Sequence, residues 1–193
     1  MKRATLGKNW TETELKEYAS RYRAVTIPVQ LQIHGKQRIL NLVEVEKFLR
    51  SARSIALGDC FCRKKVKKCD SPLDTCLSLN KTAEELVGKG LSVKIDLENA
   101  LKILKRAHEA GLVHVTYATP EKDKPEYICS CCSCCCHSLS GLIRFGMISA
   151  VEPSEYIATN NVRTCINCGK CAERCQFKAR SFQDGKIEFD KTR

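Results

Sequence analysis

The order of polar and apolar residues near the start of the chain predicts a helix followed by a β-hairpin. Thr11 opens a capping-box pattern, which predicts a helix over residues 12–23. From 25 to 33, apolar and polar residues alternate with the period of a strand, and Pro28 places this strand at a sheet edge. Residues 38–42 fit the returning strand of the hairpin.

Helical periodicity follows in the next part of the chain. The apolar positions of residues 43–55 share one helical face and predict a helix that ends near Gly58. A second capping box at 82–85 predicts another helix. Asp96 is placed to cap a third helix, which runs to Ala110.

A strand follows this third helix, because residues 112–118 alternate again. Many winged-helix domains end in this order, so a winged-helix-like domain is one interpretation. The segment 119–126 is polar and contains two prolines, as linkers often do. We therefore expect an α+β protein with a helix–hairpin–helix region (1–58), a cysteine-containing helical, winged-helix-like domain (59–119) and a cysteine-rich, ferredoxin-like half-module (120–193).

The composition is that of a globular protein, with 43% hydrophobic and 28% charged residues among 193. No stretch approaches the roughly 18 apolar residues of a membrane helix, and residues 1–10 lack the apolar run of a secretory signal. We therefore expect a cytoplasmic protein. Its formal net charge of +11 favours anions, which could be nucleic acid, an acidic electron carrier or a metal cluster within the chain.

The cysteine content departs furthest from the average, at 14 residues in three groups. Without an export signal a disulfide scaffold is disfavoured, and metal or redox chemistry becomes the leading interpretation. The last group has the spacing C-x2-C-x2-C-x3-C and consists of Cys165, Cys168, Cys171 and Cys175. Two-residue gaps let thiolates surround one iron–sulfur cube, whereas zinc sites usually show two separated pairs. We expect an iron–sulfur cluster here, with zinc as the alternative.

Residues 161–190 resemble a half-module of the bacterial-type 4Fe–4S ferredoxins, although Gln176 stands where that family has proline. In that family the fourth cysteine, here Cys175, ligates the other cluster of a pair. The segment 185–193 resembles the part that leads into a second cysteine run. The resemblance therefore implies either a chain truncated at Arg193, which we favour, or a second cluster with ligands from elsewhere.

The first group has the spacing C-x-C-x6-C-x6-C and consists of Cys60, Cys62, Cys69 and Cys76. Residues i and i+2 of a strand point to the same side, so Cys60 and Cys62 can face one metal centre. We interpret the four as ligands of a second iron–sulfur cluster, with zinc or reduced structural thiols as alternatives. The basic residues between Cys62 and Cys69 form either a solvated loop or a patch that docks an acidic partner or offsets cluster charge.

The middle group places six thiols within eight residues: Cys129, Cys131, Cys132, Cys134, Cys135 and Cys136. Neighbouring side chains diverge, so these six cannot all bind one cube, and we expect them to be divided between metal centres. A less usual cluster that breaks bonds is a further interpretation. His137 is either a ligand or, as we favour, a residue beside the cluster or on the surface.

The three groups, with Arg63 and Leu77, resemble multi-cluster iron–sulfur proteins of anaerobic bacteria and archaea over residues 43–190. We expect two or three [4Fe–4S] clusters that pass single electrons to or from an acidic ferredoxin, a flavoprotein or an enzyme subunit. Glycine-rich nucleotide motifs are not found in the sequence, so an electron carrier or redox-enzyme subunit is favoured over an independent catalyst. The alternatives are a redox- or oxygen-sensing DNA-binding regulator and a zinc-stabilised interaction module.

Overall fold

The computed structural model describes residues 9–21, 23–27, 46, 48–118, 125–147, 159 and 161–190. The chain divides into two compact units, Met1–Glu152 and Pro153–Arg193. This division differs from the three regions expected from the sequence. The cysteines from 129 to 136 belong to the first unit, together with those from 60 to 76, and not to the unit that holds the ferredoxin-like motif.

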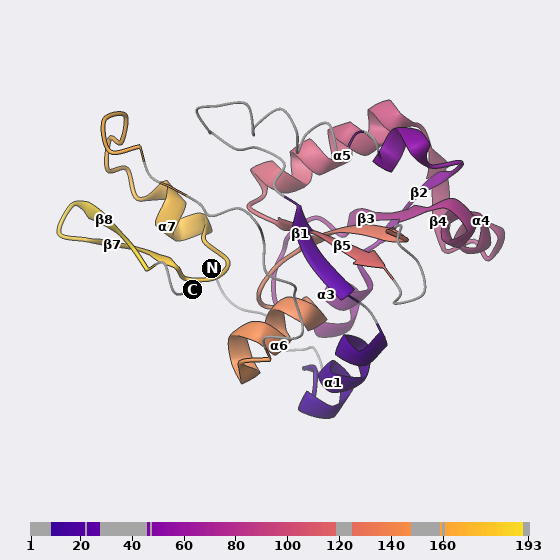
Figure 1. Ribbon diagram of the computed structural model, residues 1–193, viewed down its shortest axis with the longest axis horizontal. Helices are drawn as coiled ribbons and strands as arrows, with labels where there is room; N and C mark the ends of the chain where they lie inside the picture. Colours follow the sequence, from indigo (N-terminus) through magenta and orange to yellow (C-terminus); the bar gives the residue numbers. More distant parts are fainter. Residues whose placement is uncertain are drawn as a thin grey trace. The chain divides into compact units, whose positions relative to one another are not determined.

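The first unit is built around an antiparallel sheet of six strands in the order β1-β5-β6-β3-β2-β4 (Figure 1). The strands are β1 (Arg23–Ile27), β2 (Ile55–Asp59), β3 (Asp74–Leu79), β4 (Ser92–Ile95), β5 (Val113–Ala118) and β6 (Tyr127–Cys131). Each strand runs antiparallel to its neighbours. Strands far apart in the sequence therefore meet at the centre of the sheet, where β3 pairs with β6.

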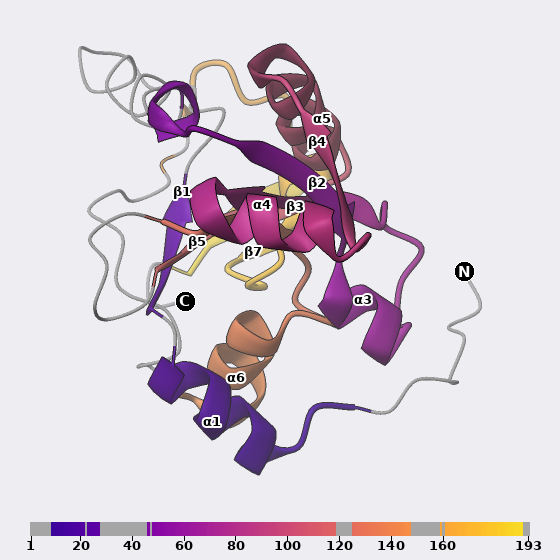
Figure 2. The ribbon, with the colours of Figure 1, turned by 90° about the vertical axis from the view of Figure 1, so that its right-hand side faces the viewer.

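Helices cover both faces of this sheet. The described helices are α1 (Glu12–Arg21), α3 (Phe61–Val66), α4 (Asn80–Gly88), α5 (Leu97–Glu109) and α6 (His137–Phe145). Figures 1 and 2 show α5 on one side of the sheet and α1 with α6 on the other. No described helix has the length and apolar character needed to span a membrane.

Helix α5 has the start and the buried face that its sequence predicts. Oδ1 of Asp96 accepts a hydrogen bond from the backbone N–H of Asn99 at 2.8 Å, which satisfies a donor of the first helical turn. Ala100 and Leu104, one turn apart, are buried against Leu77 of the sheet. Strand β5 follows this helix, as expected, but it joins the six-stranded sheet, and the winged-helix assignment is not confirmed.

Three local predictions differ from the structure. Residues 48–51 of the expected helix are helical, but Ile55–Asp59 forms strand β2 instead of the helix end, because it pairs with a strand on each side and this pairing overrides the helical pattern. Helix α4 begins at Asn80, so Thr82 lies inside it and not at its cap. The segment 119–126 connects β5 to β6, which pair with each other as a hairpin, so it is not a linker between domains.

The expected strand residues 28–33 and 38–42 lie outside the described residues. The second unit contains helix α7 (Lys170–Arg174) and the strands β7 (Arg180–Gln183) and β8 (Lys186–Phe189). These strands form an antiparallel hairpin across a turn at Asp184 and Gly185, both with positive φ. A hairpin was expected here, but the ferredoxin-like fold is not confirmed.

Candidate metal centres

Strand parity places three cysteines on one face of the sheet. On β3, Leu77 belongs to the core beneath α5, so its neighbour Cys76 points to the opposite face. On β6, Ile128 belongs to the same core, so Cys129 and Cys131 also point away from α5. The pairing of Leu77 with Ile128 sets the two strands side by side and brings the three thiols together.

These thiols line a cavity of about 820 Å³. Three more cysteines reach it from helix starts: Cys60 and Cys62 at the beginning of α3, and Cys136 at the N-cap of α6. The cavity thiols are therefore Cys60, Cys62, Cys76, Cys129, Cys131 and Cys136. All six are free thiols, so each is available as a metal ligand.

Two aromatic side chains place polar atoms beside the cavity thiols. Nδ1 of His137 lies 3.2 Å from Sγ of Cys62, and burial lowers the pKa of His137 to about 4, so its imidazole is neutral at pH 7. The hydroxyl of Tyr117 donates a hydrogen bond to Oγ of Ser138 at 3.1 Å and lies 3.6 Å from Sγ of Cys136. His137 therefore lies beside a candidate ligand, as the sequence allowed, while Tyr117 was not anticipated.

The cavity thiols change one another's ionisation. Hydrogen bonds from the thiols of Cys62 and Cys76 lower the pKa of Cys60 to about 2. The interaction with Cys60 raises the pKa of Cys62, and the interaction with Cys129 raises that of Cys76. Ionisation of the Cys60 thiol thus makes ionisation of the neighbouring thiols less favourable. Releasing the remaining protons requires added positive charge, which a metal centre supplies.

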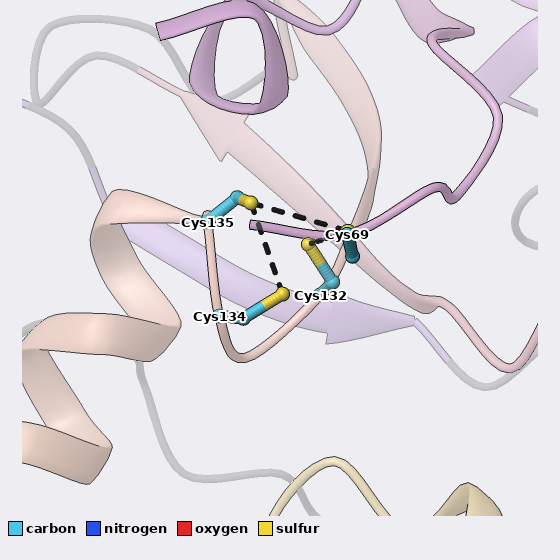
Figure 3. Close-up of side chains that lie close together, drawn as sticks. All are labelled: Cys69, Cys132, Cys134 and Cys135. Carbon is cyan, nitrogen blue, oxygen red and sulfur yellow. Dashed lines mark hydrogen bonds between the residues drawn. The ribbon is translucent and has the colours of Figure 1, made fainter. Parts of the chain in front are cut away.

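The other four cysteines of the first unit form a second group, the four-thiol cluster (Figure 3). It consists of Cys69, Cys132, Cys134 and Cys135, whose sulfurs all lie within 4.8 Å of one another. Sγ of Cys69 is 3.7 Å from that of Cys132 and 3.9 Å from that of Cys135, which is 3.7 Å from that of Cys134. Three of the thiols come from the loop between β6 and α6, and the fourth comes from the loop after α3. These four residues could bind a metal.

Apolar side chains surround the four-thiol cluster. Cys132 and Cys135 belong to a buried group that includes Trp10, Val66 and Leu112. Nε1 of Trp10 donates a hydrogen bond to the carbonyl oxygen of Cys135 at 2.7 Å, which fixes the cysteine loop against the segment before α1. Such a shell keeps water away from the thiols and restrains their positions.

Arg63 is the charged residue shared by both thiol groups. It lines the cavity and is only 2% exposed. Its Nη1 donates to the carbonyl oxygen of Ser130 at 2.8 Å and lies 3.9 Å from Sγ of Cys132, and its Nη2 donates to Oγ1 of Thr75. Burial alone would lower the pKa of Arg63, but the thiolates of Cys60 and Cys132 outweigh burial and raise it. Arg63 therefore stays charged and offsets the charge of these thiolates.

Three lysines of the same run have partners other than the thiols. Lys64 pairs with Asp59 at 3.2 Å. The ammonium of Lys65 lies 3.9 Å from the centre of the Trp10 ring, and Lys68 donates to Oδ1 of Asn9 at 2.7 Å. Lys64 and Lys65 also line the cavity, but neither is buried between the two thiol groups as Arg63 is.

The cysteines of the second unit lie around α7. Cys165, Cys168 and Cys171 are exposed and Cys175, at the C-cap of the helix, is half-buried. Gly169 has φ +74°, and a Cβ there would lie 3.3 Å from the ring of Phe182. Glycine thus allows the turn between Cys168 and Cys171 to form close to the hairpin.

The structure divides the cysteine groups differently from the sequence interpretation. The spacing of the first group suggested one centre for all four of its members, but Cys69 lies with the four-thiol cluster, whereas Cys60, Cys62 and Cys76 line the cavity. The middle group is divided, as expected: Cys129, Cys131 and Cys136 line the cavity, and Cys132, Cys134 and Cys135 join Cys69.

Trp10 and Tyr117 are the site residues that sequence analysis missed. Tyr117 lies in an alternating strand pattern with no signal that distinguishes it from an ordinary core residue, whereas Trp10, one residue before the Thr11 cap and packed in one cluster with Leu15, fits a hydrophobic staple. Comparison with models of protein families, with curated proteins and with solved structures gave no match. The function is therefore inferred from the chemistry of the thiol groups alone.

Proposed function

We propose that this protein is an iron–sulfur protein that transfers single electrons, with one cluster in the six-thiol cavity and a [4Fe–4S] cluster in the second unit. The observation that carries the proposal is the convergence of six free thiols on one cavity of about 820 Å³. Thiolates are the ligands of iron–sulfur clusters, and six exceed the four that a single tetrahedral ion takes.

The spacing of the cavity thiols supports a polynuclear group. Among the described residues, the four-thiol cluster is the one group of three or more possible ligands whose atoms all lie within 4.8 Å of one another. The cavity thiols are thus spread more widely around their space than the ligands of one ion. A cluster of several irons bridged by sulfide would fill such a space and keep its ligands apart.

The surroundings of the cavity suit electron transfer. Arg63 supplies a buried positive charge, and the hydroxyl of Tyr117 lies close enough to Cys136 to polarise its sulfur. Charge, burial and hydrogen bonds to the sulfurs set the reduction potential of a cluster. The net charge of +11 favours an acidic partner, such as a ferredoxin, a flavoprotein or an enzyme subunit.

For the second unit the proposal rests on the motif of Cys165, Cys168, Cys171 and Cys175. Its C-x2-C-x2-C-x3-C spacing is that of ferredoxin ligand runs. The exposure of three of these thiols would place a cluster near the surface of the second unit, where a redox partner can approach it.

The first test is the iron and acid-labile sulfide content of the full chain, purified without oxygen. We expect about eight irons or more per chain, with matching sulfide, and visible absorbance that bleaches on reduction. Cys76→Ser should remove the iron of the cavity and leave that of the second unit, whereas Cys168→Ser should do the reverse. A chain that binds zinc but no sulfide would contradict the proposal.

A second measurement tests electron transfer itself. Stopped-flow mixing with a reduced, acidic ferredoxin should bleach the clusters rapidly, and the rate should fall as salt is added, because the attraction is electrostatic. Clusters that are present but accept no electrons from such carriers, in a chain that binds DNA in a salt-dependent way, would replace this proposal with the regulator.

A further inference from the structure

We propose that Cys69, Cys132, Cys134 and Cys135 hold a single zinc ion, separate from any iron–sulfur cluster. The geometry of the sulfurs carries this inference. Three of the six sulfur–sulfur separations are 3.7, 3.7 and 3.9 Å, and all four sulfurs lie within 4.8 Å of one another. With zinc–sulfur bonds of about 2.3 Å, the edge of a regular tetrahedron of sulfurs is about 3.8 Å.

The same separations do not fit a cubane. In a [4Fe–4S] cluster each thiolate binds a different iron at a corner of the cube, so the four sulfurs lie farther apart than the ligands of one ion. The four-thiol cluster has no space of that size between its sulfurs, in contrast to the six-thiol cavity. The two thiol groups of the first unit therefore suit two different kinds of metal centre.

A cation is needed if all four thiols of the cluster are to be ionised together, as the ligands of a metal ion are. Four thiolates this close repel one another strongly, and two of the residues, Cys132 and Cys135, are almost fully buried. A divalent ion neutralises two of the four negative charges. Nη1 of Arg63, 3.9 Å from Sγ of Cys132, offsets part of the remainder.

The ion would have a structural role. Cys69 lies in the segment 67–72, which forms neither helix nor strand, and the other three ligands lie 63 to 66 residues later in the chain. A metal bridge between them closes a long loop, which stabilises the folded state. All four coordination positions are taken by protein sulfur, as in closed structural zinc sites.

The ion would also position the cavity ligands. Cys131 directly precedes and Cys136 directly follows the run that contains three of the zinc ligands, and both line the six-thiol cavity. Fixing residues 132–135 therefore fixes the backbone that carries these two cavity thiols. Zinc has no redox chemistry of its own, so its effect on the cavity would be through geometry alone.

The decisive measurement is zinc K-edge X-ray absorption on the full chain, together with the zinc content. We expect one zinc per chain with four sulfur neighbours at about 2.3 Å. Nitrogen or oxygen neighbours, or no tightly held zinc after purification in zinc-containing medium, would overturn the proposal. This measurement needs no variant and does not depend on what occupies the cavity.

Matched variants then assign the site. Cys134→Ser should abolish the stoichiometric zinc, whereas Cys129→Ser, which changes a thiol of the six-thiol cavity on the preceding strand, should leave one zinc per chain. If neither the unaltered protein nor Cys134→Ser contains zinc, and the variant loses iron and sulfide, the four thiols belong to an iron–sulfur cluster and the zinc assignment fails. If both variants keep zinc, the ion lies elsewhere and the assignment fails as well. Either failure leaves the iron count of the cavity, and thus the proposed function, separately measurable.

Discussion

Nη1 of Arg63 donates a hydrogen bond to the carbonyl oxygen of Ser130 at 2.8 Å, which joins α3 to β6 between two neighbouring thiols of that strand, Cys129 and Cys131. Arg63 is 2% exposed, and its pKa is raised because the thiolates of Cys60 and Cys132 outweigh the effect of burial. A single buried cation therefore serves the cavity thiols and the four-thiol cluster together.

Replacing this cation is expected to destabilise the first unit. Arg63→Met keeps an apolar stem but leaves the carbonyl of Ser130 and the hydroxyl of Thr75 without their donor and the thiolates without their cation. We expect the free energy of unfolding, measured by denaturant titration, to fall by about 3 kcal/mol. The matched control is Lys64→Met in the same helix, where the ion pair with Asp59 is exposed and worth less than about 1 kcal/mol. Equal losses in the two variants would contradict the role given to Arg63.

The hydroxyl of Tyr117 is expected to raise the reduction potential of the cavity centre. It is buried and lies 3.6 Å from Sγ of Cys136, and its proton, which is donated to Ser138 here, would turn to a thiolate ligand at Cys136 and stabilise the more negative, reduced state. A loss of about 1 kcal/mol in Tyr117→Phe corresponds to a decrease of about 40 mV for one electron, measured by redox titration. Ser138→Ala, which removes the acceptor of this hydroxyl but keeps the hydroxyl itself, should not lower the potential. An unchanged potential in Tyr117→Phe would show that the hydroxyl does not act on the sulfur.

Sequence reasoning succeeded where the signals are local. Helix α1 begins with the predicted capping box: Oγ1 of Thr11 accepts from the N–H of Glu14 at 3.3 Å, and the Glu14 carboxylate accepts from the N–H of Thr11 at 2.9 Å. Helix α5 has its predicted cap at Asp96. Each of these contacts joins residues three positions apart, so the pattern that specifies it lies within one helical turn.

The division of the cysteines could not be predicted in the same way. Strands β3 and β6 pair although their partner residues are some 50 positions apart in the sequence. Which thiols meet depends on this pairing and on the face of each strand that α5 covers. Strand β2 was missed for a similar reason: it is held by pairing with β3 and β4, which lie later in the chain and leave no signal within residues 55–59. Arg63 has a basic neighbour on its C-terminal side, and only the tertiary structure distinguishes its buried position from the solvated end of Lys64.

His114 should make the first unit less stable in mild acid. Burial, with a smaller effect from His108, lowers the pKa of His114 from 6.5 to about 4. Above pH 6.5 the imidazole is neutral in both folded and unfolded states, so it has no effect. As the pH falls from 6.5 to 4, the unfolded state takes up a proton first, and the stability decreases by up to about 3 kcal/mol.

The measurement is the free energy of unfolding as a function of pH. In His114→Gln this part of the slope between pH 6.5 and 4 should disappear, since glutamine does not titrate and can still bond Oγ of Ser130, which lies 3.1 Å from Nδ1 of His114. His108→Gln should keep most of the slope, because burial is the larger cause of the shift. Identical pH profiles for His114→Gln and the unaltered protein would contradict the assignment.

In the second unit, Gly169→Ala should weaken the contact between the cysteine motif and the hairpin. Gly169 and Gly185 both have φ +74°, so alanine at either position costs about 1 kcal/mol in backbone strain. At Gly169 the new Cβ would also meet the ring of Phe182 at 3.3 Å, whereas nothing lies within 4 Å of a Cβ at Gly185. Gly185→Ala is therefore a control with the same backbone strain and no steric contact.

Hydrogen–deuterium exchange of peptides from residues 180–189 in the full chain measures the difference between these two variants. We expect Gly169→Ala to increase the exchange more than Gly185→Ala does, by about tenfold or less, because Phe182 is 46% exposed and its ring can move outward. Adding Phe182→Ala to each variant should make their effects equal, since the ring that distinguishes the two sites is then gone. If the two single variants already exchange alike, the motif and the hairpin are not coupled through this contact, and Gly169 serves the turn between Cys168 and Cys171 alone.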